Sequence, residues 1–151
     1  MAGSLLACVD GSELSVPVVR IAHRLAECLR LELVLMHVAQ PTEVPGVSAA
    51  PAGQERLHEE ELRDAEALLD RAALEAGLGD EARQRSEIGP PADRIVAACA
   101  DEQAELVVIG SRGRGGLKTA LMGSVSSKVA SDAPCPCVIV SASAAARPFL
   151  A

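Results

Sequence analysis

Three short apolar runs set the strongest limit on what this chain can fold into. They span Leu5 to Val9, Leu33 to Val38 and Leu106 to Ile109. Short runs that are apolar almost throughout indicate strands buried on both faces, which is typical of a parallel sheet. Between the first two runs, apolar residues recur at helical spacing from Leu14 to Leu29, and parallel strands need such a helical connection. The pattern therefore predicts a strand, a helix and a second strand.

The remaining sequence continues this alternation. Ser15 is expected to cap the first helix, which would place Pro17 in the first turn, where proline is tolerated. The strand expected from Ala82 to Ile88 is polar, which suits a sheet edge. The other expected elements are a charged helix at 54–76 that stops at Gly77, a helix opened by Pro90 and Pro91, a helix at 124–131 and a strand at 137–140. Five strands alternating with four helices predict an α/β fold, a doubly wound parallel sheet with helices on both faces.

Length and composition favour a single domain over residues 1–151. Of the 151 residues, 49% are hydrophobic and 23% charged, so the chain falls outside the range typical of disordered proteins. Ala39 to Gly53, with three prolines and two glycines, is expected to be a flexible loop, and residues 142–151 a loose tail. Five cysteines without CxxC spacing indicate a reduced compartment.

Charge and aromatic content argue against several kinds of partner. The net charge of −7 leaves no basic footprint for nucleic acid or anionic lipid. Phe149 is the single aromatic residue, whereas proteins that bind single-stranded nucleic acid need rings on which bases stack. No apolar run approaches the roughly 20 residues that span a bilayer, and the N-terminus lacks the pattern of a secretory signal. We therefore expect a cytoplasmic protein with no nucleic acid or membrane partner.

A glycine-rich segment follows the third apolar run. Four of the seven residues from Gly110 to Gly116 are glycine, and glycine lets backbone N–H groups approach phosphate oxygens. Gly123 and Ser124 would present a helix N-terminus, whose partial positive charge also favours phosphate. The Walker A motif does not fit because Leu117 precedes Lys118, and the dinucleotide fingerprint does not fit because Lys118 stands where its third glycine belongs. The segment therefore indicates phosphate binding of another kind.

This segment resembles the universal stress protein family, whose ATP-binding members carry Gly, two residues, Gly, nine residues and then Gly-Ser or Gly-Thr. Here these positions are Gly110, Gly113, Gly123 and Ser124. Further matches are the turn Asp10-Gly11-Ser12-Glu13, the pair His37-Val38, the pair Gly89-Pro90, and Ala133-Pro134-Cys135-Pro136 before the last strand. The resemblance covers nearly the whole chain, and with it we expect the strand order 3-2-1-4-5.

The resemblance implies ATP as the ligand, with the presence of Mg²⁺ left open. Asp10 would contact the ribose or the adenine side, Gly110 would lie against the ribose, and the Val38 backbone would face the adenine edge. Phosphates would be contacted by Gly113, Gly123 and Ser124, with Ser126 close by and Arg112, Arg114 and Lys118 as further candidates. The implied ATP-binding residues are Cys8, Val9, Asp10, Val38, Ile109, Gly110, Gly113, Gly123, Ser124, Val125 and Ser126.

Two of the polar residues also have ordinary structural interpretations. Asp10 can stabilise its own turn together with Ser12, and this role can coexist with a ribose contact. His37, at the end of a central strand, is more simply explained as a hydrogen-bonded structural histidine than as a general base or a metal ligand. We expect no metal site and no catalytic residue.

The basic residues and the thiols of the C-terminal half are equally open to a plain interpretation. Arg112, Arg114 and Lys118 either lie near the terminal phosphate or belong to a solvated loop. Cys135 and Cys137 share a face of an extended segment, and buried packing explains them better than redox sensing.

We interpret the chain as an ATP-binding regulatory or sensing module in stress response. No general base, paired carboxylates or activated nucleophile accompany the glycine-rich segment, so any hydrolysis should be slow. The alternatives are a slow ATPase or a phosphoryl or nucleotidyl transferase on the same fold, and a protein-interaction module that works without nucleotide. ATP, ADP, AMP and cyclic nucleotides are not separated by these residues. The resemblance also implies a homodimer through Cys137 to Val140, besides an unknown protein partner.

Overall fold

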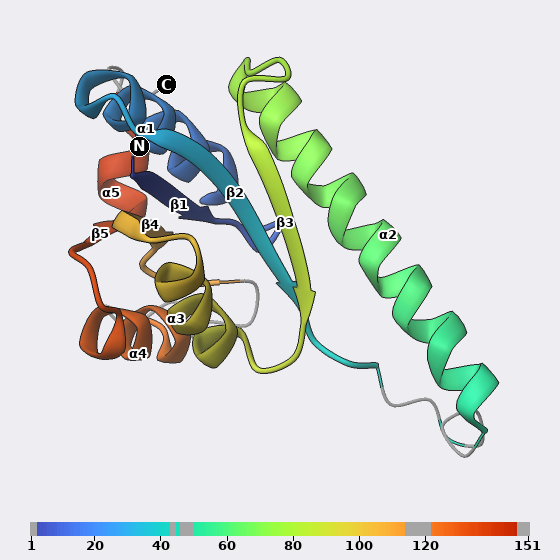
Figure 1. Cartoon of the computed structure of the whole chain (residues 1–151). Coiled ribbons are helices and arrows are strands. Elements are labelled where there is room, and N and C mark those ends of the chain that lie inside the picture. Colours follow the sequence, from blue (N-terminus) through green and yellow to red (C-terminus); the bar gives the residue numbers. More distant parts are fainter. Residues whose placement is uncertain (1–2, 43–44, 46–49, 114–121, 148–151) are drawn as a thin grey trace.

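The computed structural model describes residues 3–42, 45, 50–113 and 122–147 (Figure 1). Strands and helices alternate along these residues, as the apolar runs predict. In chain order the elements are β1 (Ser4–Cys8), α1 (Ser15–Leu29), β2 (Glu32–Ala39), α2 (Pro51–Ala76), β3 (Arg83–Ile88), α3 (Pro91–Asp101), β4 (Ala104–Gly110), α4 (Ser124–Asp132), β5 (Cys137–Val140) and α5 (Ala142–Ala145).

The strands form one parallel sheet in the order β3-β2-β1-β4-β5. Leu5 of β1 pairs with Leu33 of β2 on one side and with Leu106 of β4 on the other. β2 and β3 are added on one side of β1, and β4 and β5 on the other. The strand order therefore reverses between β1 and β4. The predicted fold class and strand order are confirmed, and the polar β3 lies at an edge of the sheet as expected.

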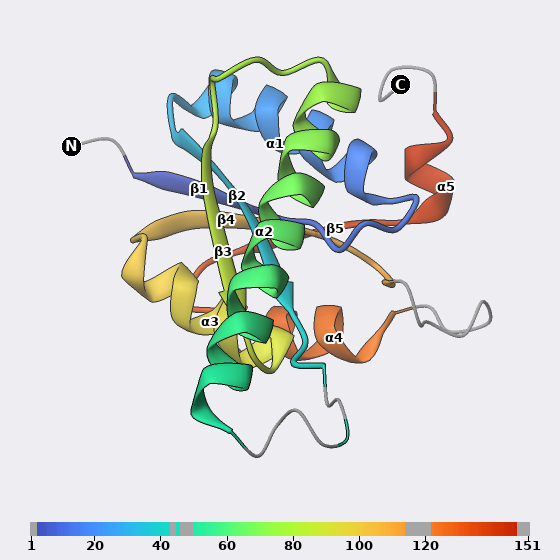
Figure 2. The ribbon, with the colours of Figure 1, turned by 90° about the vertical axis from the view of Figure 1, so that its right-hand side faces the viewer.

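Two hydrophobic cores lie on opposite faces of the sheet, because successive side chains of a strand point to opposite sides. Leu5 and Ala7 of β1 face one core, which includes buried residues of α1 and α2. Leu6 and Cys8 face the other core, to which α3 and α4 contribute. Figure 2 shows α2 lying across the sheet in front of β2 and β3. Each fully buried leucine of this kind contributes about 1.5–3 kcal/mol to folding.

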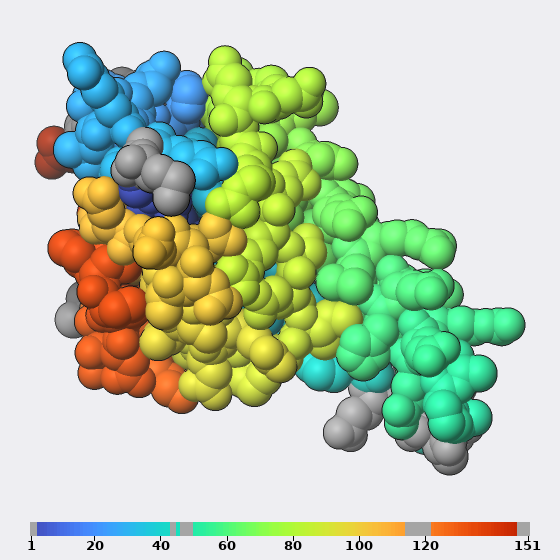
Figure 3. Space-filling model, in the orientation of Figure 1, coloured from blue at the N-terminus to red at the C-terminus, as the bar shows by residue number. Residues whose placement is uncertain are grey.

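Helix α2 is longer than the sequence pattern predicts and extends past the sheet. It begins at Pro51 rather than at Gln54, because proline is well suited to the first helical turn. Its buried residues lie between Ala65 and Ala73, while its N-terminal part projects beyond the main body of the molecule (Figure 3). It ends at Gly77, whose φ of 83° is the left-handed conformation that glycine adopts most easily. The expected loop therefore loses residues 51–53 to the helix.

Another expectation about a helix end was wrong. Ser15 does not cap α1; Leu14 occupies the cap position, and the Ser15 hydroxyl instead accepts the Gly11 N–H at 3.0 Å. The C-terminal tail begins with the short helix α5, at whose start the Ser141 hydroxyl oxygen accepts the Ala144 N–H at 3.1 Å. Among the described helices, none is both long and apolar enough to cross a membrane.

Candidate functional site

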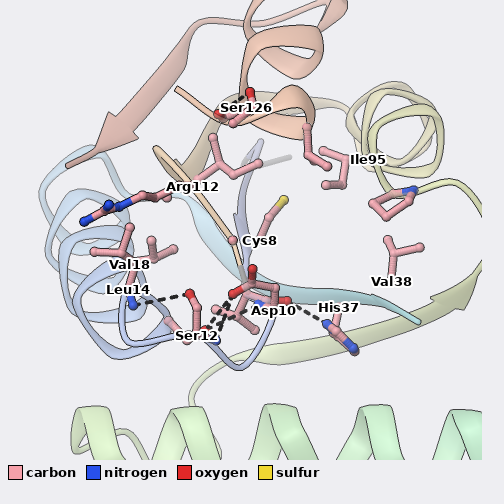
Figure 4. A pocket seen from close by; sticks show the side chains of 18 of the residues that line it. Cys8, Asp10, Ser12, Leu14, Val18, His37, Val38, Ile95, Arg112 and Ser126 are labelled. Carbon is pink, nitrogen blue, oxygen red and sulfur yellow. Dashed lines mark hydrogen bonds between the residues drawn. The ribbon is translucent and has the colours of Figure 1, made fainter. Parts of the chain in front are cut away.

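A cavity of about 550 Å³ opens at the carboxyl ends of β1, β2 and β4 (Figure 4). It lies where the strand order reverses, which is the usual position of a ligand in an open α/β sheet. Its walls come from β1 and the turn after it, β2, β4, the starts of α3 and α4, and from Leu14 and Val18 at the start of α1. The topology alone therefore gathers residues from most of the chain length at one place.

Each of the eleven predicted ATP-binding residues lines this cavity, although they are spread from Cys8 to Ser126. Arg112 also lines it, whereas Arg114 and Lys118 lie outside the described residues. Figure 4 places the Arg112 side chain beside Leu14 and Val18. The remaining cavity-lining residues, which were not predicted to bind ATP, are Ser12, Leu14, Ser15, Val18, Met36, His37, Gln40, Pro91 and Ile95.

The inner part of the cavity is apolar. Val38, Ile95 and Ile109 contribute aliphatic surface there, and Cys8, only 7% exposed, lines the same part. Burial, together with the nearby thiols of Cys99 and Cys137, raises the pKa of Cys8 well above its usual value. Because the thiolate is the nucleophile, Cys8 acts here as a small hydrophobic residue.

The other cysteines of this region are also packing residues. Cys135 and Cys137 pack half-buried against the core that contains Cys99, and the thiols are free. The pKa of Cys99 is raised to about 12, mainly by burial and secondly by the Cys135 thiol. Of the cysteines, Cys8 is the one among the residues that line the cavity.

Asp10 organises the turn between β1 and α1. Its Oδ1 accepts the Ser12 N–H at 2.9 Å and the Ser15 hydroxyl at 3.4 Å. Its Oδ2 lies against Gly113, close enough that a Cβ at that position would overlap it. The predicted turn role is therefore present, and the second oxygen brings the turn into contact with the glycine-rich segment.

The base of the glycine-rich segment is closed by hydrogen bonds to one carbonyl. Ser111 O accepts the Gly123 N–H at 2.5 Å and the Ser126 hydroxyl at 2.8 Å. The Ser111 N–H donates in turn to Val140 O of β5 at 2.8 Å. Ser126 is 2% exposed, and its hydroxyl hydrogen is used within the protein. The end of β4 and the start of α4 are thus held together, and no sequence pattern indicates this closure.

Helix α4 directs its N-terminus at the cavity. Gly123 takes an extended conformation before the helix, no side chain caps the helix, and both Gly123 and Ser124 line the cavity. The first N–H groups of a helix have no partner within it and carry a partial positive charge. This end of the cavity is therefore suited to an anionic group.

The His37 side chain is hydrogen-bonded within the protein, as predicted. Its Nδ1 donates to Val9 O at 2.7 Å, because a carbonyl oxygen can only accept. Among the residues that the structure describes, no group of three or more His, Cys, Asp or Glu side chains is placed to hold a metal ion.

The fold and the cavity define a doubly wound α/β protein with a ligand-sized site at its switch point. The family model of the universal stress proteins matches residues 1–141. The chain is 31% identical to a Thermus aquaticus protein, the universal stress protein in QAH/OAS sulfhydrylase 3'region, over 91% of this chain and 97% of that one. It is also 31% identical to universal stress protein YxiE of Bacillus subtilis, over 93% and 99% of the two chains. The chain belongs to the universal stress protein family.

Solved structures share this fold. Protein MJ0577 superposes with a TM-score of 0.73 at 23% identity, over 93% of this chain and 96% of that chain. A universal stress protein in complex with cAMP gives 0.59 at 22% identity, over 91% and 96%. The Archaeoglobus fulgidus universal stress protein in complex with dAMP gives 0.52 at 20% identity, over 91% and 96%. Because these structures are only 20–23% identical to this chain in sequence, their similarity shows a shared fold and nothing further.

Proposed function

We propose that this universal stress protein binds ATP in the cavity and acts as a nucleotide-dependent regulatory or sensing module. The proposal rests on one observation: the eleven residues that the family resemblance implies bind ATP all line the same cavity. Its volume of about 550 Å³ is within the range of small-molecule sites, which is roughly 300–1,000 Å³. Two family structures with this fold, in complex with cAMP and dAMP, support an adenine nucleotide as the ligand class.

The cavity offers a different environment to each part of the nucleotide. The aliphatic side chains of Val38, Ile95 and Ile109 suit the flat base, which gains from burial against apolar surface. Asp10 is well placed for the ribose, because a carboxylate accepts hydrogen bonds from hydroxyl groups. The N-terminus of α4 at Gly123 and Ser124 suits the phosphates.

Mg²⁺ can accompany the phosphates without a protein cage. This ion usually keeps several waters and is held by substrate phosphates with one or two carboxylates. Of the described residues that line the cavity, Asp10 is the acidic one, so it would be the protein group nearest to such an ion. When bound, the ion would neutralise phosphate charge.

We also propose that two copies associate through β5. This strand lies at the sheet edge next to β4, and residues 137–139 are only half-buried. An apolar edge of this kind is normally covered by another chain or element. Sedimentation velocity would show a dimer, and a monomer at all concentrations would contradict the association.

Ser124→Asp tests the nucleotide site directly, with Ser127→Asp as its matched control. Both residues are exposed and lie in the first turns of α4, but Ser124 lines the cavity and Ser127 is not among the residues around it. A negative charge near a helix N-terminus does not harm folding, but at Ser124 it would repel phosphate. We expect denatured wild-type protein and Ser127→Asp to release ATP, identified by mass spectrometry, and Ser124→Asp to release none.

The outcomes separate the possible roles of this site. Release of another nucleotide in place of ATP would keep the site and change the ligand. If the wild type and Ser127→Asp release no nucleotide, and the wild type does not bind added ATP in calorimetry, the proposal is overturned. An interaction module that works without nucleotide would then be favoured. Continued release from Ser124→Asp would show that the nucleotide is held elsewhere.

A further inference from the structure

The hydrogen-bond ladder between β1 and β2 stops one step early. Pairing ends at Cys8 and Met36, and the Val9 N–H still donates to Met36 O at 2.9 Å. In a parallel ladder the next bond would run from the Val38 N–H to Val9 O. The register does not continue to Val9, and Val9 O accepts Nδ1–H of His37 at 2.7 Å instead. A side chain has thus taken the place of a backbone donor.

The backbone of Val38 consequently faces the cavity. Carbonyl groups along a strand point alternately to its two neighbours: Met36 O accepts from β1, whereas Ala39 O accepts the Gly89 N–H at 2.9 Å on the β3 side. The N–H and C=O of Val38 therefore point to the β1 side, beyond the last paired residue of β1. Val38 lines the cavity at this point, so one donor and one acceptor lie together in an apolar surrounding.

This pair matches one edge of adenine. Adenine carries an acceptor, N1, beside the donating amino group at position 6, whereas guanine carries a donor, N1–H, beside the acceptor O6. Buried polar groups select strongly for a ligand that satisfies them, since an unsatisfied group costs free energy. A Val38 N–H without a partner in the protein can donate to N1 of adenine and so favours this base. The same N–H, once bonded to Val9 O, would not contribute to base selection.

We propose that His37 is a positioning residue for base recognition: by occupying Val9 O, it leaves the Val38 N–H open to N1 of adenine. The inference rests on the proposed nucleotide site and adds a residue that reads the base without touching it. The sequence places His37 beside Val38, but only the interrupted ladder shows what the side chain does.

Two variants and two ligands test the role. His37→Leu removes the donor, so the Val38 N–H is expected to close onto Val9 O. His37→Asn keeps a short side-chain amide that can donate to Val9 O. The ligands are ATP and its 1-deaza analogue, in which N1 is replaced by C–H. Binding is measured by calorimetry, and hydrogen exchange of the Val38 amide is followed by NMR in the free proteins.

The wild type is expected to bind ATP about tenfold more tightly than the 1-deaza analogue, the effect of one hydrogen bond. His37→Leu is expected to bind both ligands alike, at the level of the wild type with the analogue, and to slow the exchange of the Val38 amide. His37→Asn should restore the preference. This loss of discrimination is a readout that a purely structural role would leave unchanged.

The failures are distinguishable. If the wild type binds ATP and His37→Leu keeps the tenfold preference, the role of His37 is overturned while the nucleotide site stands. If exchange at Val38 is equally slow in the wild type and in His37→Leu, the N–H is not held open and the role is likewise overturned. If the wild type binds neither ligand, the nucleotide site and the role of His37 fall together.

Discussion

At the residue scale, Asp10 and Gly113 depend on each other. The sequence identifies both, one in a turn and one in a glycine-rich segment, but it cannot show that they touch across more than a hundred residues. In the structure Asp10 Oδ2 fills the space where a side chain at Gly113 would begin. The need for glycine at this position therefore comes from a neighbouring carboxylate as well as from the expected approach of phosphate.

Gly113→Ala should consequently destabilise the protein even without nucleotide. The new methyl group would displace the Asp10 carboxylate and weaken its 2.9 Å bond from the Ser12 N–H. We expect the free energy of unfolding to fall by about 1 kcal/mol, the usual value of such a hydrogen bond. Urea unfolding in the wild-type and Asp10→Ala backgrounds measures this, and the loss should disappear in the second. An equal loss in both would show that Asp10 is not the cause.

At the element scale, the sequence predicts the existence of strands and helices better than their ends. Continuous apolar runs make the central strands plain, because burial on both faces leaves no other pattern. The ends depend on contacts that no local pattern records. Ser15 is a good capping residue, yet its hydroxyl accepts the Gly11 N–H because Asp10 folds the preceding turn back onto it. Helix α5 forms from residues whose composition suggested a tail, since Ser141 caps it.

The same reasoning explains which parts of the site were missed. Leu14, Val18 and Ile95 follow helical spacing, and that spacing predicts burial without telling whether a residue faces a core or a cavity. The motif residues were found through the resemblance to the universal stress protein family, whose glycine and serine spacing this chain matches. The closure of the segment by Ser111 and Ser126 needed the fold, because a backbone carbonyl carries no sequence signal.

At the scale of the whole molecule, the topology positions the site. Parallel strands joined by helical crossovers bring every carboxyl end to one edge of the sheet. Because the strand order reverses between β1 and β4, the connections that follow these two strands run to opposite sides, which leaves an opening between them. The expected edge could be predicted from the alternation of elements alone. The width of the cavity opening could not be predicted in this way, because it depends on the distance of α1 and α3 from the strands.

ATP should therefore stabilise the whole fold, since the cavity exists only when β1, β2, β4 and α4 are assembled. At a concentration of about 100 times its dissociation constant, a ligand that binds only the folded state adds about 2.7 kcal/mol. For a chain of this size, 1 kcal/mol corresponds to roughly 2–4 °C, so the melting temperature should rise by about 5–10 °C. Scanning calorimetry on the wild type and Ser127→Asp, first freed of nucleotide, should show this rise on addition of ATP, while Ser124→Asp should show almost none. A rise of the same size in Ser124→Asp would mean that the phosphates do not lie at the start of α4.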